Sequence, residues 1–176
     1  TVPIESSAGF VAKLVNDEAK TLGIEATAST KVKISAPASN GTISFNLLSK
    51  AGVANDADIS ASILSTDLTN LANSINNFSG RTGVVANLSS DKKHIIMENL
   101  DGDDIQISSF SSPNTVEMEV LKSDFSSFSS PVTVTLDNTN FKAARFSGEL
   151  KITSSSAIST SNNGGGSTVT GVQNAL

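Results

Sequence analysis

The sequence predicts an α+β fold in which two amphipathic helices pack on antiparallel sheets and the C-terminal part is rich in β-structure. Two segments repeat apolar residues at helical spacing, whereas most of the remaining chain alternates apolar and polar residues with a period of two. Short turn sequences separate the alternating runs. At 176 residues, the chain is long enough to bury a core as one ordinary domain or two small ones.

The first helix is expected over residues 8–22. Ser6 or Ser7 precedes it as a candidate N-cap, and Gly23 follows as a candidate stop. Its apolar stripe consists of Phe10, Val11, Leu14, Val15, Ala19 and Leu22. We expect this stripe to lie against a sheet.

The second helix is expected over residues 65–78. Ser65 or Thr66 is the candidate N-cap, Asp67 suits the first turn, and Gly80 is the candidate stop. The stripe of Leu68, Leu71, Ala72 and Ile75 has the spacing of one buried helical face.

The alternating runs predict strands that each have one wet face. They are Val32/Ile34, Ile43/Phe45/Leu47, Ile59/Ala61/Ile63, Ile105/Ile107, Val116/Met118/Val120, Val132/Val134/Leu136 and Phe146/Gly148/Leu150/Ile152. Turns are predicted at Asn40-Gly41, Asp101-Gly102 and Ser130-Pro131. The stretch from Ser154 to Thr170 is rich in Ser and contains Gly164–Gly166, which predicts a linker or loop.

An internal repeat occupies the first two thirds of the chain. In each copy a Gly follows an Asn seven positions later, and the copies lie sixty residues apart: Asn16 and Gly23, then Asn76 and Gly83. An alternating strand pair follows each Gly and ends in Ile43-Ser44-Phe45 or in Ile105-Gln106-Ile107. The repeat predicts two units, each a helix lying on a β-hairpin, with positive φ at the Gly. We expect the Asn side chain to bond carbonyls left free at the helix C-terminus.

The second copy resembles the IN motif of bacterial flagellins and of the hook-associated and capping proteins of the same axial family. The residues that carry the resemblance are Ile75-Asn76 and Thr82-Gly83-Val84-Val85-Ala86. Residues 99–105 are similar to the strand that follows this motif, and residues 144–150 are similar to strands late in flagellin outer regions. The first copy departs from the motif, because Val15 replaces the Ile and Leu22 replaces the Thr.

The resemblance implies the surface-exposed, hypervariable outer region of a flagellin, an extracellular structural part of the bacterial flagellum. Its expected role is in motility and in the surface properties of the filament. Its expected partners are neighbouring flagellin subunits in a homopolymeric filament. The resemblance implies a structural protein, not an enzyme, with no catalytic, cofactor-binding or metal-binding residues.

The resemblance also suggests how the chain is organised. Two tandem helix/hairpin units are expected over residues 1–112, and an antiparallel β segment of the same or a second lobe over residues 113–160. A flexible linker is expected over residues 161–176. The long terminal helices that build the filament core in this family are absent from this sequence, which begins at Thr1, so we expect it to be the outer portion of a longer protein.

Composition disfavours several other classes of function. A net charge of -5 disfavours a nucleic-acid or anionic membrane partner, and the basic residues Arg81, Lys92, Lys93, Lys142 and Arg145 are scattered. No apolar run approaches the roughly 18 residues of a membrane span. The chain has no Cys to act as a thiolate nucleophile, and no Trp or Tyr to anchor a binding hot spot.

Three groups of residues are candidates for chemistry. His94 is the single histidine, so no His pair can form within one chain, and we expect it to be structural or at the surface. The cluster Asp101-Gly102-Asp103-Asp104, with Glu98 nearby, offers oxygen ligands for Ca²⁺ but lacks the spacing of an EF-hand. A solvated hairpin turn is the favoured interpretation of this cluster. Asn55-Asp56-Ala57-Asp58 is a weaker candidate of the same kind.

The sequence offers sites for attached sugars, and its alternative function is to bind them. Ser126–Ser130 and Ser154–Ser161 are predicted acceptors for O-linked glycans, and Asn40, Asn77 and Asn87 match the N-glycosylation pattern. The alternative function is a cell-surface or phage adhesin whose Ser/Asn-rich strand face binds glycans. A third interpretation, an enzyme, lacks convergent His, Cys and paired carboxylates.

Overall fold

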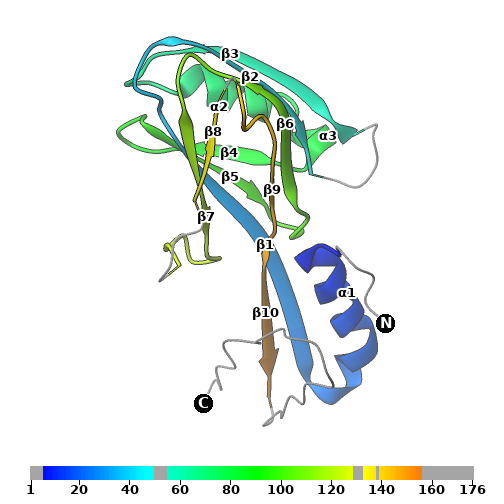
Figure 1. Ribbon diagram of the computed structural model, residues 1–176. Helices are drawn as coiled ribbons and strands as arrows, with labels where there is room; N and C mark the ends of the chain where they lie inside the picture. The colour runs from blue at the N-terminus through cyan, green and yellow to red at the C-terminus, as the bar shows by residue number, and fades with distance from the viewer. Residues whose placement is uncertain (1–5, 50–54, 129–132, 138, 156–176) are drawn as a thin grey trace.

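The computed structural model describes residues 6–49, 55–128, 133–137 and 139–155, and has a mixed α/β fold with antiparallel sheets (Figure 1). The strands are β1 (Ile24–Ser35), β2 (Gly41–Leu48), β3 (Ala57–Ile63), β4 (Val85–Leu88), β5 (His94–Asn99), β6 (Ile105–Ser111), β7 (Val116–Leu121), β8 (Thr133–Leu136), β9 (Ala144–Phe146) and β10 (Glu149–Ser154). The helices are α1 (Ala8–Ala19), η1 (Lys20–Leu22), α2 (Thr69–Asn76) and α3 (Ser79–Thr82).

Two sheets form the larger part of the molecule, which we call the body. One is six-stranded, with the order β4-β5-β1-β7-β8 and with β10 paired to β1 off this path, and the other is four-stranded, with the order β3-β2-β6-β9. Their apolar faces meet in one cluster of buried side chains that includes Val32, Phe45, Ile75, Met118 and Phe146. Segments on both sides of Ser112 therefore contribute to the same core. This packing follows from the alternation in the sequence, because one face of every strand is apolar.

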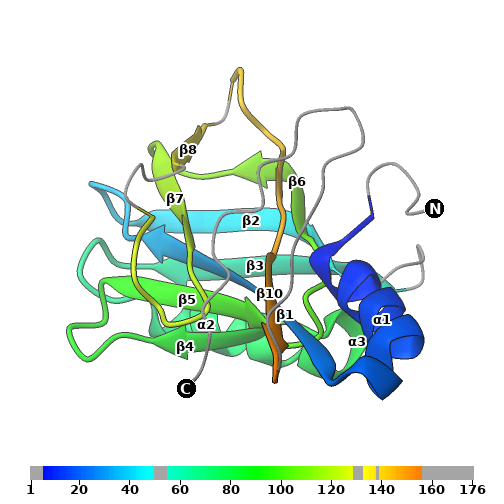
Figure 2. The ribbon, with the colours of Figure 1, turned by 90° about the horizontal axis from the view of Figure 1, so that it is seen from below.

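A thinner part, which we call the stalk, projects from the body. β1 runs through both parts: residues 30–35 pair with β5, and residues 24–29 pair with β10. α1 packs on this two-stranded ribbon, as Figures 1 and 2 show. In α1 only Ala12 is buried. Phe10 is 42% exposed, so the prediction that it lies with the rest of the stripe against a sheet is wrong.

Both predicted helices are present, with shorter α-helical cores than expected. Ser7 caps α1, because its Oγ accepts the Phe10 N–H at 3.2 Å. α2 begins at Thr69, whose N–H donates to Asp67 Oδ1 at 2.8 Å, so neither Ser65 nor Thr66 is the cap. Gly80 lies within α3 and does not end the second helix. α2 ends at Asn76, with Asn77 as its C-cap. Gly83 ends the following α3 at φ 75°, and Gly23 ends η1, which follows α1, at φ 68°.

Neither hairpin forms as predicted, because the strands at residues 43–45 and 105–107 lie in a different sheet from the strands that precede them. β1 and β2 lie in different sheets and face each other across the core, whereas β4 and β5 do pair as a hairpin. β5 and β6 are likewise in different sheets, so the Asp101-Gly102 turn is not a hairpin turn either. Two alternating strands joined by a short loop look the same in sequence whether they pair edge to edge or pack face to face. The turn predicted at Ser130-Pro131 and the linker over residues 161–176 lie outside the described residues.

Candidate functional site

The two Asn residues of the repeat make the same pair of hydrogen bonds in two different places. Asn16 Nδ2 donates to the Ala26 carbonyl at 2.8 Å, and the Ala26 N–H donates to Asn16 Oδ1 at 2.7 Å. Asn76 makes the equivalent bonds to Ala86, at 2.9 and 2.7 Å. We call each arrangement an Asn–Ala clasp. The prediction that these side chains bond helix carbonyls is wrong, since they bond a strand.

Each clasp occupies a strand edge that no other strand covers. Ala86 lies on β4, which ends its sheet, and Ala26 lies on the half of β1 that pairs only with β10. The Asn amide satisfies one backbone donor and one backbone acceptor, as a neighbouring strand would. An edge treated in this way is less available for pairing with another chain.

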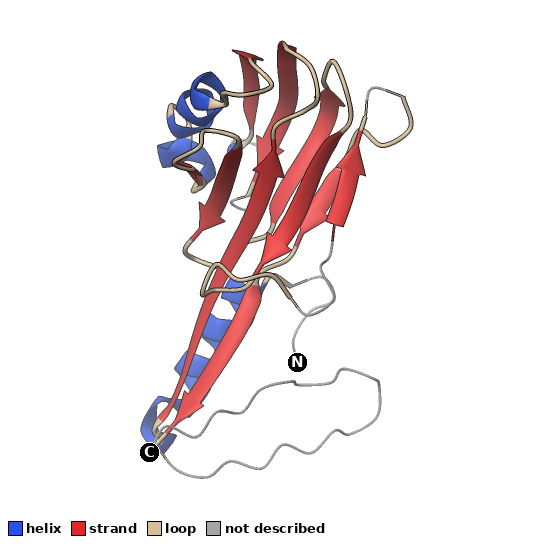
Figure 3. Ribbon diagram, turned by 90° about the vertical axis from the view of Figure 1, so that its left-hand side faces the viewer, coloured by secondary structure: helices blue, strands red, loops and turns tan. Residues whose placement is uncertain are grey.

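α2 bonds to a second open edge as well. Asn70 Nδ2 donates to the Ser62 carbonyl at 3.0 Å, and Ser74 Oγ donates to the Ser60 carbonyl at 3.2 Å, both on the edge strand β3. Because Asn76 of the same helix bonds Ala86 of β4, α2 is bonded to the edges of both sheets along one flank of the body (Figure 3). Leu71, Ala72 and Ile75 lie buried between those edges. This flank is closed by side chains in place of a strand.

Body and stalk meet where glycines allow close backbone contact. The Gly9 N–H at the start of α1 donates to the Gly102 carbonyl at 2.9 Å. A Cβ at Gly102, where φ is 74°, would lie 2.4 Å from the Ala28 Cβ. A Cβ at Gly148, between β9 and β10, would lie 2.8 Å from the Ser29 carbonyl oxygen. Three chain segments thus cross at a point, which we call the neck, where only glycine fits.

The acidic residues at positions 101–104 belong to the neck, where they make structural contacts. Asn99 Oδ1 accepts the N–H groups of Asp101 and Asp103, which shapes the loop that receives α1. Asp103 Oδ1 accepts the Ser7 hydroxyl, and buried Asp104 pairs with Arg145 at 2.6 Å. In the described part of the chain, no group of three or more His, Cys, Asp or Glu side chains is placed to hold a metal ion. Asp101 and Asp103 are therefore parts of a junction.

The remaining sequence candidates lie apart from one another. His94 begins β5, half-buried, and its backbone N–H donates to Ser89 Oγ. Arg81 stacks on Phe78, and Lys92 pairs with Asp67 at 3.3 Å. Ser126 and Ser127 are exposed, as are Asn40, Asn77 and Asn87. None of the described helices has the length and apolarity needed to cross a bilayer.

A buried lysine was not expected from the sequence. Lys31 is 5% exposed where β1 leaves the body, and its Nζ pairs with Glu98 Oε1 at 2.8 Å. The same ammonium donates to the Ser123 carbonyl and lies 3.3 Å from the centre of the Phe125 ring. These contacts hold the loop after β7 against the outer face of the six-stranded sheet. Next to it, the Lys33 ammonium donates a hydrogen bond that lowers the pKa of Glu119.

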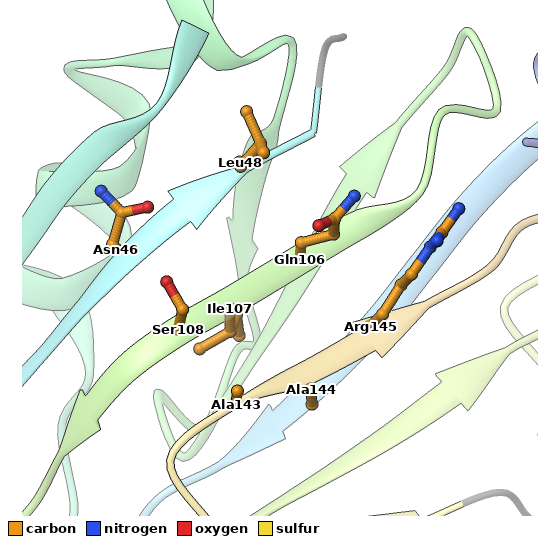
Figure 4. Close-up of a pocket in the computed structure, with 8 residues that line it drawn as sticks. All are labelled: Asn46, Leu48, Gln106, Ile107, Ser108, Ala143, Ala144 and Arg145. Carbon is orange, nitrogen blue, oxygen red and sulfur yellow. The ribbon is translucent and has the colours of Figure 1, made fainter. Parts of the chain in front are cut away.

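An open hollow of about 380 Å³ lies on the outward face of the four-stranded sheet. Two rows of side chains cross β2, β6 and β9 there, as Figure 4 shows. Leu48, Gln106 and Arg145 are register partners in one row, and Asn46 and Ser108 are partners in the next, beside Ala143. The sequence showed that these positions face outward. It did not show that they adjoin one another, because register is set by tertiary pairing.

Hydrogen bonds fix some of these side chains and leave others open. Asn46 Nδ2 donates to Asp56 and Asp58, both at 3.1 Å, which accounts for the second acidic segment. Arg145 Nε donates to Asp104. Within the described residues, the Gln106 amide and the Ser108 hydroxyl make no hydrogen bond. The hollow thus presents two open polar side chains between two that are held in place.

No protein-family model matches this chain, and no curated protein matches it.

Proposed function

We propose that this chain is the surface-exposed outer region of a bacterial flagellin, an extracellular structural part of the flagellar filament. The observation that carries the proposal is the repeated Asn–Ala clasp. Asn16 and Asn76 stand sixty positions apart, and each bonds the Ala three positions after a glycine of positive φ. The residues that resemble the flagellin IN motif are the ones that form this arrangement.

The same observation supports a duplicated unit, in a narrower form than the sequence predicted. What the two copies share is a helix, an Asn near its end, a left-handed Gly and an Ala on an open strand edge. The strands that follow pair differently in the two copies. We infer that the helix-to-strand corner is the duplicated element, and that its surroundings diverged.

The closed edges and the stalk also suit a subunit displayed at high density. Clasps that cover backbone edges oppose uncontrolled pairing between neighbouring copies. Ser, Thr and Asn on the outward faces offer no large apolar patch. Contacts with neighbouring flagellin subunits would then be weak individually and gain strength from repetition along the filament.

An in-frame deletion in the parent gene tests the proposal. The Ser155 N–H donates to the Gly23 carbonyl at 3.1 Å, so Ile24–Ser154 can be removed and the ends joined by a Gly-Ser link. We expect filaments to assemble, because no described helix within Ile24–Ser154 is a long helix of the kind that builds the filament core in flagellins, and we expect swimming or filament stability to change. A strain that carries Thr135→Ala, at an exposed position of β8, is the matched control.

Two results would contradict the proposal. One is a deletion strain that swims normally and loses attachment to host surfaces, which would favour the adhesin. The other is a parent gene whose product is absent from purified filaments.

A further inference from the structure

We infer that the hollow on the four-stranded sheet is a binding site for a neutral carbohydrate, one or two sugar units in size. The inference does not depend on the filament role. It stands on the two side-chain rows that cross β2, β6 and β9 (Figure 4).

The chemistry of the lining matches sugar hydroxyls. A sugar hydroxyl both donates and accepts hydrogen bonds, and so do the open Gln106 amide and Ser108 hydroxyl. The Asn46 amide group is oriented by its two carboxylate partners, so its Oδ1 is presented as an acceptor. Leu48 and Ala143 supply apolar surface for the C–H groups of a sugar ring. A volume of about 380 Å³ is at the small end of the range for ligand sites.

The charges favour a neutral ligand over an acidic one. Arg145 is the one cationic side chain of the lining, and it is paired with Asp104 at 2.6 Å. At the other end of the hollow, Asp56 and Asp58 lie within hydrogen-bond distance of Asn46. An anionic sugar would meet a compensated cation at one end and two carboxylates at the other, with repulsion from those carboxylates.

The test is a titration of the ¹⁵N-labelled chain, followed by NMR, with maltose, lactose and diacetylchitobiose, and with sialyllactose as the acidic comparison. We expect at least one neutral disaccharide to shift the signals of Asn46, Gln106 and Ser108 saturably. The Kd should be on the order of 1 mM, because the lining has no aromatic ring on which a sugar could stack.

Two variants sharpen the test. Gln106→Ala removes one open amide and should weaken binding by about 2- to 10-fold, the value of one hydrogen bond. Ser60→Ala lies on the outward face of β3, outside the hollow, and should leave the Kd unchanged. Both positions lie on the outward face, so both variants should fold, which their melting temperatures will verify.

Several outcomes would overturn the inference. One is the absence of a saturable shift with any of the three neutral disaccharides at a concentration of about tenfold the expected Kd. A second is a set of shifted signals that lie outside the hollow. Binding of sialyllactose alone, or equal affinity of Gln106→Ala and the unmodified chain, would also contradict it.

Discussion

The stalk and the body use the same helix-to-strand corner with different degrees of burial. In the body, α2 buries Leu71, Ala72 and Ile75 between two sheet edges. In the stalk, α1 lies on a two-stranded ribbon and leaves Leu14 and Val15 half-buried. A two-stranded ribbon has little apolar area to offer a helix, and is marginal by itself. The comparison indicates that the corner specifies local geometry, while stability comes from what the helix faces.

The largest expected effect is a difference in unfolding free energy between substitutions in the two helices. Ile75→Ala opens a cavity in the fully buried core and should lower the free energy of unfolding by about 2–5 kcal/mol. Leu14→Ala removes a half-buried side chain and should lower it by less than about 1.5 kcal/mol. Chemical denaturation of both variants measures the difference. Equal losses would contradict the contrast between body and stalk.

The neck provides the next largest effect. Gly102→Ala places a Cβ against Ala28 at positive φ and should cost about 2–4 kcal/mol. Gly80→Ala is the matched control, because nothing lies within 4 Å of a Cβ there and the residue is helical. That variant should be neutral or stabilising by up to about 1 kcal/mol. If Gly102→Ala had the same melting temperature as the unmodified chain, the neck would not be close-packed.

The clasps should contribute less than either. Asn76→Ala removes two hydrogen bonds and exposes one strand edge to water, which should cost about 1–3 kcal/mol. Asn16→Ala should cost a similar amount, because Ala26 and Ala86 are both buried, at 3% and 5% exposed. Asn77→Ala, one position further along and exposed, is the control and should change stability by under about 0.5 kcal/mol. Amide hydrogen exchange at Ala86 in Asn76→Ala reports directly on the edge, and unchanged protection there would refute the clasp.

The smallest expected effect is the pH dependence of stability that comes from Asp137. The Phe141, Asn140 and Thr139 N–H groups donate to Asp137 Oδ1 and lower the pKa of this carboxyl from 3.8 to about 2. Because the folded pKa is depressed, this contribution to stability is complete above about pH 4 and disappears as the pH falls through 2. The loop between β8 and β9 should therefore keep its structure to low pH. NMR titration of Asp137 checks this, and a midpoint near 3.8 would contradict the bonding.

The parts of the fold that depend on neighbouring residues followed from the sequence. Helical spacing located α1 and α2, and the seven-residue interval from Asn to Gly identified both left-handed glycines, Gly23 and Gly83. These features are set by backbone sterics and local capping, which act over a few residues.

Features that depend on tertiary pairing could not be predicted from the sequence. Alternation could not tell whether β1 and β2 share a sheet, so a hairpin was wrongly expected between them. A lysine in a strand is ordinarily placed on the wet face, and Lys31 is buried only because the loop after β7 folds over it. The hollow depends on cross-strand register, which brings together Leu48, Gln106 and Arg145 although they are far apart in the sequence.

The proposal of a filament exterior is tested most directly by locating the domain on cells. Antibodies raised against the folded chain can be located by immunogold electron microscopy on bacteria that express the parent gene. The account predicts gold along the whole length of the extracellular filaments, and none on a strain that lacks Ile24–Ser154. Gold confined to the cell body, to the filament tip or to structures other than flagella would contradict it.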